Sequence, residues 1–303
     1  MSAEHETQLV GLIGWPVEHS TSPAMFNAAF ASLGINWRYE AFPVQPQQLK
    51  QFIQDLRERG LRGVNVTVPH KHAVVDMLDV VPPEIKALGA VNTIQVTQNG
   101  LNRLHGTNTD IIGFYRDLTG YVSATPDQSR ALILGAGGAA RAAAFVLARL
   151  GYHLHVACRH PSRGLELIRD VQAGLSVIGS AKRDPIESTH WRMQMLTLPW
   201  DRIAAIAPTI DLIVNCTPVG MWPHVDQSPW PEEIPIPREA TVYDMVYRPE
   251  ETKLLRQAKA AGAHAITGLG MLVHQGAESF RLWTGQEPPL DVMLAAARQA
   301  LHS

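Results

Sequence analysis

Two oppositely charged side chains follow strand-like segments and could share one pocket. The segment 63–68 alternates in the manner of a strand and leads into Pro69, which cannot continue a central strand. Lys71 therefore lies just past a strand end, and Asp110 lies just past another. Because open α/β sheets bind ligands beyond the carboxyl ends of their strands, the two charges are placed where a ligand is expected.

Strand-like and helix-like segments alternate along the chain, which is typical of parallel βαβ units. The expected strands are 9–13, 37–42, 63–68, 130–134, 153–157, 211–215 and 241–245. The expected helices are 24–33, 47–59, 73–80, 139–150, 251–261, 271–283 and 290–301. The segment 171–199 shows no clear pattern, and the proline-rich segment 223–237 is expected to be a long loop. The last two helices could return to the first part of the chain.

Composition narrows the function to small-molecule chemistry. The 303 residues suggest about two domains, and 46% hydrophobic and 18% charged residues are typical of a soluble globular protein. A net charge of −2 without a basic run predicts binding to neither nucleic acid nor a membrane surface. Cys158 and Cys216 lie in apolar segments and are expected to be reduced thiols. We expect a cytoplasmic monomer or homodimer without a signal peptide or membrane span.

A glycine-rich turn between a strand and a helix predicts a dinucleotide site. The strand 131–134 runs into Gly135-Ala136-Gly137-Gly138-Ala139, and an alanine-rich helix follows. In such a turn, Gly135 permits the tight bend and Gly137 lets the backbone approach a pyrophosphate at the helix N-terminus. The alternative is a strand-to-helix turn that binds no ligand.

Two arginines indicate which dinucleotide binds. Arg159 and Arg163 follow the next strand, 153–157, where an NAD-binding domain usually carries an acidic residue for the ribose hydroxyl. Arginine instead suits the 2′-phosphate of NADP, because its guanidinium forms charge-assisted hydrogen bonds. The alternative is that both are solvated surface cations.

Motifs along nearly the whole chain resemble those of the shikimate dehydrogenase family. The matching patterns are G-x-P-x-x-H-S-x-S-P at 14–23, N-V-T-x-P-x-K at 65–71, A-V-N-T at 90–93, N-T-D at 108–110, D-x-x-Y-x-P at 244–249 and G-x-x-M-L-x-x-Q-G-A at 268–277. The segment 215–221 is similar to the family's loop beside the nicotinamide. The chain departs from the family at Cys158-Arg159-His160, where Asn-Arg-Thr is frequent, and at Arg248, where Asn is common. The stretch between Arg163 and Asn215 is also longer than usual.

The resemblance implies a fold, a reaction and a set of site residues. The fold is α/β with two domains: an N-terminal substrate-binding domain of residues 1–111 plus 271–303, to which the C-terminal helices return, and a Rossmann-type NADP-binding domain of residues 112–270. The reaction is the reversible, NADPH-dependent reduction of 3-dehydroshikimate to shikimate in aromatic amino-acid biosynthesis. The implied catalytic residues are Lys71 and Asp110, and the implied substrate ligands are Ser20, Ser22, Thr67, Asn92, Tyr247 and Gln275. Cofactor contacts are expected from residues 135–139, Arg159, Arg163, Met245 and Gly268.

Other interpretations of the same residues stay open at this point. Ser22 could simply cap the helix that continues through Pro23, and Asp110 could cap a helix that begins at Ile111. His70 and His72 flank Lys71, but without a third ligand at suitable spacing we expect no metal site. Rival functions are a quinate/shikimate dehydrogenase that uses NAD or NADP, and a non-catalytic sensor of shikimate-pathway metabolites. Retention of both Lys71 and Asp110 argues against the sensor, because binding alone does not need that pair.

Overall fold

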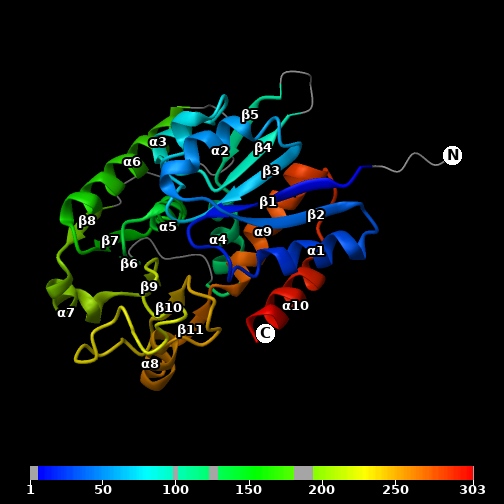
Figure 1. Cartoon of the computed structure of the whole chain (residues 1–303). Coiled ribbons are helices and arrows are strands. Elements are labelled where there is room, and N and C mark those ends of the chain that lie inside the picture. Colours follow the sequence, from blue (N-terminus) through cyan, green and yellow to red (C-terminus); the bar gives the residue numbers. More distant parts are fainter. Residues whose placement is uncertain (1–5, 98–101, 123–128, 181–193, 303) are drawn as a thin grey trace. The chain divides into compact units, whose positions relative to one another are not determined.

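The protein folds as two compact units in a computed structural model that describes residues 6–97, 102–122, 129–180 and 194–302 (Figure 1). The first unit comprises the described residues up to Gly113 and those from Val273 onwards, and the second runs from Phe114 to Leu272. Both boundaries fall inside helices, α4 (Thr109–Thr119) and α9 (Leu269–Thr284), so the chain passes from one unit to the other along helical backbone.

A five-stranded mixed sheet in the order β2-β1-β3-β4-β5 forms the centre of the first unit. The strands β1 (Gln8–Gly14), β2 (Trp37–Pro43) and β3 (Leu61–Val66) are parallel, as the sequence pattern predicts. The strands β4 (Thr93–Val96) and β5 (Leu104–Thr107) run antiparallel to their neighbours. The sequence did not predict these last two strands, because four residues give too little alternation to indicate a strand.

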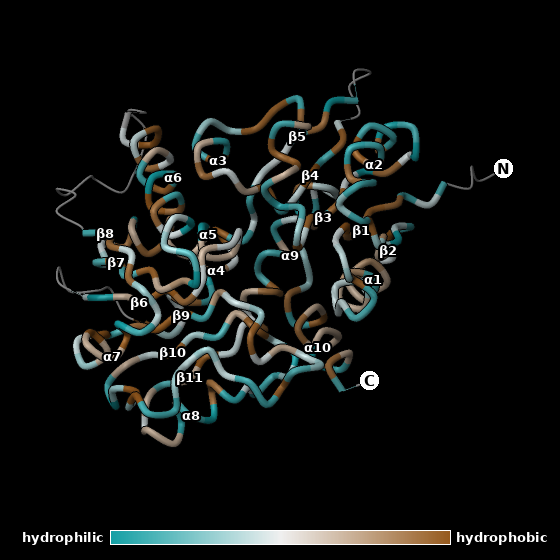
Figure 2. Tube along the Cα trace, turned by 60° about the vertical axis from the view of Figure 1, so that its left-hand side comes forward, coloured by the Kyte–Doolittle hydropathy of each residue, from teal (hydrophilic) through white to brown (hydrophobic). Residues whose placement is uncertain are grey.

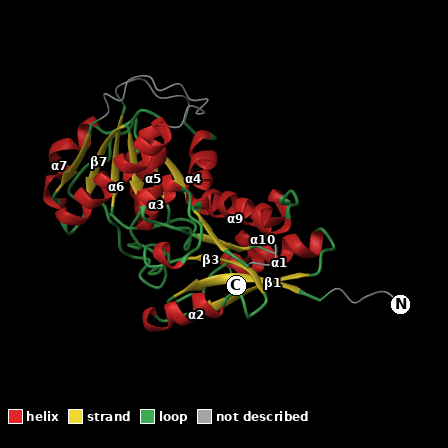
Figure 3. Ribbon diagram, turned by 90° about the horizontal axis from the view of Figure 1, so that it is seen from above, coloured by secondary structure: helices red, strands yellow, loops and turns green. Residues whose placement is uncertain are grey.

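Helices cover both faces of this sheet (Figure 3). The helix α2 (Leu49–Asp55) lies on one face, while α1 (Ser22–Ser32), α9 and α10 (Leu290–Leu301) lie on the other. Ile85 of α3 (Pro83–Leu88) packs in the same hydrophobic cluster as α2. The helix expected at 73–80 is wrong, since the segment forms turns and one 3₁₀ turn at Val75–Met77. The amides of Asp79 and Val80 both donate to the carbonyl of Leu104 on β5, so they are not available to a helix.

Aromatic side chains join the C-terminal helices to the first sheet. The rings of Phe30 and Phe280 stack with centroids 5.3 Å apart, and the indole of Trp283 donates to the carbonyl of Ile94 at 3.0 Å. A Cβ on Gly63 would lie 2.2 Å from Nε1 of Trp283. Only glycine permits that approach of helix to strand, so the C-terminal helices are built into the core of the first unit.

The second unit is a six-stranded, fully parallel sheet in the order β11-β10-β9-β6-β7-β8. Its strands are β6 (Arg130–Leu134), β7 (His153–Ala157), β8 (Met195–Leu198), β9 (Leu212–Asn215), β10 (Thr241–Asp244) and β11 (His264–Thr267). Read from β6 outwards, this is the strand order of a Rossmann fold. The order reverses between β6 and β9, and dinucleotides bind beyond the strand ends at that point.

The faces of the second sheet are covered by α5 (Gly138–Arg149) and α6 (Pro161–Ser180) on one side and by α7 (Ile203–Ile206) and α8 (Lys253–Ala261) on the other. In Figure 2 the tube of α8 alternates between teal and brown, as expected for a helix with one face on a sheet. The segment 171–199, in which the sequence shows no clear pattern, contains the end of α6 and all of β8. Residues 181–193 of this segment lie outside the described residues. The segment 223–237 contains no helix or strand, so the expected loop is confirmed. Among the described residues, no helix has both the length and the apolar character needed to cross a membrane.

Candidate active site

The turn after β3 holds Lys71 by anchoring the backbone around it. The His70 ring, which is almost fully buried, forms a hydrogen bond between Nε2 and the carbonyl of Val44 at 2.7 Å. The His72 ring forms one between Nδ1 and the carbonyl of Gly89 at 2.8 Å, and the carbonyl of Lys71 accepts from the amide of Val91 at 2.9 Å. The two imidazoles thus fix the turn. No group of three potential metal ligands occurs among the residues that the structure describes.

Lys71 and Asp110 meet, as the sequence predicts. Lys71 Nζ donates to Asp110 Oδ2 at 2.6 Å, and the lysine and aspartate side chains are 16% and 7% exposed. Asp110 lies in the first turn of α4, where the helix dipole favours a negative charge. The alternative interpretation of Asp110 as the helix cap is wrong, because α4 begins at Thr109 and Asn108 Oδ1 accepts from the amide of Asp110 at 3.1 Å. Asp110 therefore does not cap the helix, and its carboxylate contacts Lys71.

Asn92 fixes Asp110 from the opposite side. The backbone amide of Thr109 donates to Asn92 Oδ1 at 2.7 Å, so the Asn92 oxygen must face the helix start. The Asn92 amide nitrogen then faces Asp110 and donates to Oδ1 at 2.7 Å. One carboxylate oxygen thus accepts from Asn92 and the other from Lys71. The carboxylate is pre-oriented before any substrate arrives.

A buried polar cluster behind Asn92 was not identified from the sequence. Asn65 Nδ2 donates to Thr93 Oγ1 at 3.0 Å and to Ser279 Oγ at 2.9 Å, and Tyr39 donates to Asn65 Oδ1 at 2.9 Å. The hydroxyl groups of Thr93 and Thr109 lie 3.1 Å apart. These residues are at most 6% exposed. The available signal was that Asn65, Thr93 and Thr109 stand inside the recognised motifs, whereas Ser279 gave none beyond its position four residues after Gln275.

The expected carboxylate-binding serines lie at the start of α1. Ser22 is the first helical residue and is buried, while Ser20 precedes the helix and its Oγ accepts from the amide of Ser22 at 3.2 Å. The interpretation of Ser22 as a helix cap is wrong, because Thr21 occupies the cap position and makes no side-chain cap bond. Thr67 follows β3, and a Cβ on Gly14 would lie 2.4 Å from its Cγ2, so the end of β1 adjoins Thr67.

Gln275 and Tyr247, the remaining expected substrate ligands, belong to different units. Gln275 is half-buried on α9, and its Oε1 lies 3.5 Å from Asn92 Nδ2, at the limit of a hydrogen bond. It therefore borders the Lys71–Asp110 pair within the first unit. Tyr247 is half-buried and follows β10 in the second unit.

The turn between β6 and α5 has the features that a dinucleotide diphosphate requires. Gly135 has a φ of +106°, a conformation that favours glycine, and its amide donates to the carbonyl of Ala157 at 2.8 Å. Gly137 is the N-cap of α5, and no described atom lies within 4 Å of the place where its Cβ would stand. Ala136, Gly138 and Ala139 complete the turn with half-buried positions. The helix N-terminus thus offers free space and amide donors to an anion.

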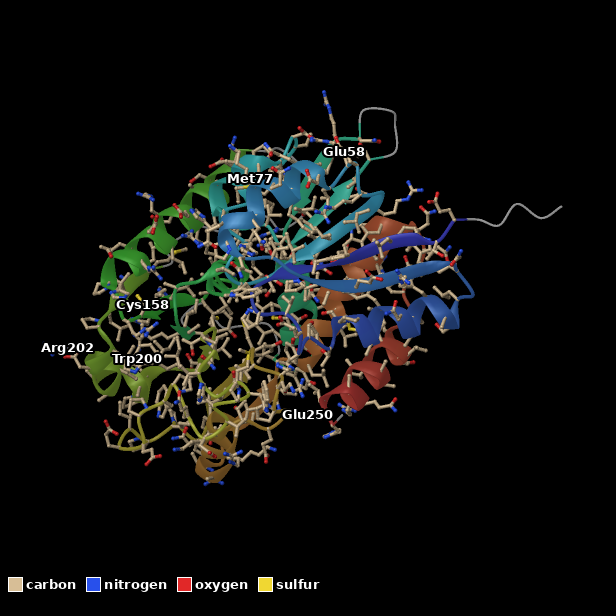
Figure 4. All side chains as sticks on the ribbon, viewed as in Figure 1. Glu58, Met77, Cys158, Trp200, Arg202 and Glu250 are labelled. Atoms are coloured by element: carbon tan, nitrogen blue, oxygen red, sulfur yellow. The ribbon has the colours of Figure 1, made fainter. Side chains whose placement is uncertain are left out.

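The two arginines expected to select NADP are exposed at the next strand end. Cys158, labelled in Figure 4, follows β7 directly, and Arg159 is the next residue. Arg163 lies in the first turn of α6, and its amide donates to the carbonyl of His160 at 2.9 Å. Neither guanidinium forms an ion pair among the described residues, so both are available to an anionic ligand.

Met245 and Gly268 are joined by close backbone packing. A Cβ on Gly268 would lie 2.5 Å from the carbonyl oxygen of Met245. Gly268 is buried in the turn between β11 and α9. This turn lies so close to the end of β10 that only glycine fits at the position. Met245 is half-buried and its amide donates to the carbonyl of Asn215 at 3.0 Å.

The strand order and the open glycine turn are those of dinucleotide-binding proteins, and the second unit assigns the chain to that class. Two family models match: the shikimate dehydrogenase substrate binding domain over residues 12–94 and the shikimate 5′-dehydrogenase C-terminal domain over residues 268–298. The chain belongs to the shikimate dehydrogenase family.

Relatives at full length support this membership. A shikimate dehydrogenase (NADP⁺) from Methanopyrus kandleri is 39% identical over 100% of this chain and 99% of its own length. The enzyme of the same name from Moorella thermoacetica is 45% identical over 97% and 94%. A shikimate 5-dehydrogenase from Thermus thermophilus, solved with NADP(H) and shikimate, is 38% identical with a TM-score of 0.80 over 97% and 99%. A quinate dehydrogenase from Corynebacterium glutamicum, solved with NAD, is 28% identical with a TM-score of 0.82 over 97% and 99%.

Proposed function

We propose that this chain catalyses the reversible, NADP-dependent reduction of 3-dehydroshikimate to shikimate. The observation that carries the proposal is the buried contact between Lys71 Nζ and Asp110 Oδ2, with Asn92 holding the other carboxylate oxygen. A metabolite sensor needs hydrogen bonds to its ligand but no proton donor. The names of the relatives supply the substrate and cofactor, and both agree with the residues of this chain.

Lys71 is the proposed acid in the reducing direction. Its ammonium donates a proton from Nζ to the ketone oxygen of the substrate and stabilises the negative charge that develops there. Asp110 keeps Nζ oriented and accepts a hydrogen bond from a substrate hydroxyl. Lys71 retains 16% exposure, so its proton can be replaced from solvent. In the oxidising direction the same nitrogen takes the proton back.

The other expected ligands orient the ring without taking part in proton transfer. Ser20 and Ser22 are proposed to hold the substrate carboxylate at the start of α1, where amide donors also favour an anion. Thr67, Asn92 and Gln275 are proposed to hold ring hydroxyls from the first unit, and Tyr247 is proposed to contribute from the second. Fixed polar contacts of this kind discriminate well, because a substrate that lacks one hydroxyl leaves a buried group unpaired.

The residues of the second unit fit NADP, which supplies the hydride acceptor and donor when bound. The turn 135–139 at the N-terminus of α5 is proposed to hold the diphosphate, and Arg159 and Arg163 the 2′-phosphate. Met245 and Gly268, at the ends of β10 and β11, are proposed to border the nicotinamide end. The described residues contain no acid between Leu154 and Gly164 that would repel the 2′-phosphate.

A spectrophotometric assay at about 340 nm tests the function with shikimate and quinate, each with NADP and with NAD. The expected result is fast reduction of NADP by shikimate and much slower reaction in the other three combinations. Equal or faster turnover of quinate would assign the chain to the quinate/shikimate dehydrogenases. Absence of turnover with either substrate, in a protein that binds shikimate, would favour the sensor.

A further inference from the structure

A fully buried carboxylate stands at the end of β10, and none of the described residues forms an ion pair with it. Asp244 is 0% exposed and pairs in register with Asn215 of β9 and Thr267 of β11. Its oxygens accept from Asn215 Nδ2 at 2.8 Å, from the amide of Val246 at 3.0 Å and from Thr252 Oγ1 at 2.6 Å. No ion pair of Asp244 occurs among the described residues. Three neutral donors therefore surround a group that is costly to bury.

The three donors belong to three different segments that meet at this carboxylate. Asn215 ends β9, and its Oδ1 accepts from the amide and the hydroxyl of Thr217 at 2.9 and 2.7 Å. This fixes the Asn215 amide and shapes the turn that follows β9. Val246 directly precedes Tyr247, so a bond to its amide shapes the turn that follows β10.

The third segment is the start of α8. Thr252 is the N-cap of that helix, is 0% exposed, and its Oγ1 accepts from the amide of Leu255 at 3.2 Å while donating to Asp244. Glu250, labelled in Figure 4, marks the stretch between Tyr247 and this cap. The turn that carries Tyr247 is consequently held at both ends by one carboxylate.

We propose that Asp244 is a positioning residue, a clamp that fixes the turns after β9 and β10 for the nicotinamide end of the cofactor and for Tyr247. The inference rests on the proposed function, which places those two turns in the binding machinery. The adenosine end is held by other segments, the β6–α5 turn and the arginines after β7. The clamp therefore acts directly on one half of the cofactor site, and its hydrogen bonds do not involve the residues of the other half.

The test compares two ligands in an Asp244→Ala variant. We expect the affinity for NADP to fall by about 10-fold and kcat/KM by about 10- to 100-fold, because small displacements at a reacting centre have effects of that size. The affinity for adenosine 2′,5′-bisphosphate, which contacts only the adenosine end, should stay within about twofold. Hydrogen exchange should accelerate in residues 216–221 and 245–249 and remain unchanged in residues 135–142.

Conservative and control variants separate positioning from charge and from general destabilisation. In Asp244→Asn the amide oxygen can still accept from Asn215 and Val246, and its nitrogen can donate to Thr252, so most of the loss should be recovered. Asp211→Ala is the matched control, since Asp211 accepts from the amide of Arg130 at 2.8 Å at the opposite end of β9. It should change neither ligand affinity.

Three results would overturn the clamp. Equal weakening of both ligands, or faster exchange in residues 135–142, would show a general structural effect. Unchanged exchange in the two turns would show that Asp244 does not hold them. Loss in Asp244→Asn as large as in Asp244→Ala would assign the effect to charge.

If Asp244→Ala does not fold, Thr252→Val and Thr252→Ser give the same contrast. Thr252→Val is expected to loosen the 245–249 turn, and Thr252→Ser to retain it. None of these outcomes depends on which substrate the wild-type protein prefers, so failure of the clamp and failure of the proposed function are distinguishable.

Discussion

The two units prepare for their ligands in opposite ways. In the first unit the centre of the expected substrate site consists of buried or half-buried side chains that are fixed by other side chains or by backbone groups, as at Lys71, Asp110 and Asn92. In the second unit the expected cofactor site is a backbone turn at Gly135–Gly137 with two exposed arginines beyond it. A small polyhydroxylated substrate offers few atoms, so each contact must be oriented in advance. A dinucleotide carries phosphates, which amides and mobile cations bind without such preparation.

The largest expected effect is that of removing the Lys71 side chain, which tests the assigned role of the first unit in catalysis. Lys71→Ala should reduce kcat by about 100- to 10,000-fold, the range expected when a general acid is lost, and leave NADP affinity nearly unchanged. Steady-state kinetics and titration with NADPH measure the two effects. Lys259→Ala is the control, because its ion pair with Glu251 is exposed and should matter little. A Lys71→Ala variant with near wild-type kcat would eliminate the assigned role.

The second prediction concerns stability and the buried carboxylate of the second unit. Burial raises the pKa of Asp244 from 3.8 to about 6, although hydrogen bonds from Thr252, Val246 and Asn215 act in the opposite direction. Because the folded-state pKa is the higher one, this group stabilises the fold fully below about pH 4 and loses that contribution as the pH rises through about 6. At about 1.4 kcal/mol per pKa unit, the loss is roughly 3 kcal/mol.

Chemical denaturation of wild type and Asp244→Asn at about pH 4 and about pH 7 tests this contribution. Asparagine does not titrate, so the variant should gain stability relative to wild type as the pH rises. A difference between the two proteins that stays constant over this range would contradict the raised pKa. The comparison also sharpens the contrast between units, since Asp110 faces a cation and Asp244 does not.

The third prediction tests the exposed arginines. Arg159→Ala and Arg163→Ala should each weaken NADP by roughly 10- to 100-fold and change NAD little, because one charge-assisted hydrogen bond contributes about 1.5 to 3 kcal/mol. Added salt should shrink the difference, since exposed charges are screened. The measurement is kcat/KM for both cofactors, with Arg169→Ala on α6 as the control. An equal loss of kcat/KM with NAD and with NADP would show that both arginines are surface charges that do not bind the 2′-phosphate.

The smallest expected effect is at Ser279, behind the substrate site. Ser279→Ala removes a hydroxyl that accepts from Asn65, but Asn65 keeps its bond to Thr93, so we expect a loss of about 1 kcal/mol in stability and a change in kcat of less than about threefold. Ser176→Ala is the matched control, because both hydroxyls donate to the carbonyl four residues earlier and Ser176 is on the exposed face of α6. A loss of kcat as large as that at Lys71 would show that the buried cluster takes a direct part in turnover.

The sequence was most informative where a pattern had a single physical cause. The run before Gly135 predicted β6 and its turn, because a strand, a glycine with positive φ and a helix start must follow one another there. Proximity of Lys71 and Asp110 was predictable because both follow strand ends in one sheet. The strands β4 and β5 were not predicted, since they are short and carry polar residues such as Gln95 and His105.

Contacts between segments that are distant in the chain could not be predicted from the local sequence pattern. Ser279 meets Asn65 across 214 positions in the chain, and nothing local to either residue announces the other. The prediction of a helix at 73–80 failed for a related reason, because the amides of Asp79 and Val80 donate to the carbonyl of Leu104 on a later strand. The clamp at Asp244 is similar, since its partners Asn215 and Thr252 are recognisable only after β9 and β10 are paired.

The C-terminal helices that cover the first sheet determine the order in which the two units fold during synthesis. Phe280 and Trp283 pack on residues such as Phe30 and Ile94, which leave the ribosome long before them. The second unit, by contrast, has all its strands once Thr267 has been made. Although domains generally fold from the N-terminus during synthesis, one face of the first sheet is covered only in part, by α1, until the last helices emerge. We expect the middle of the chain to become protease-resistant on the ribosome before its beginning does.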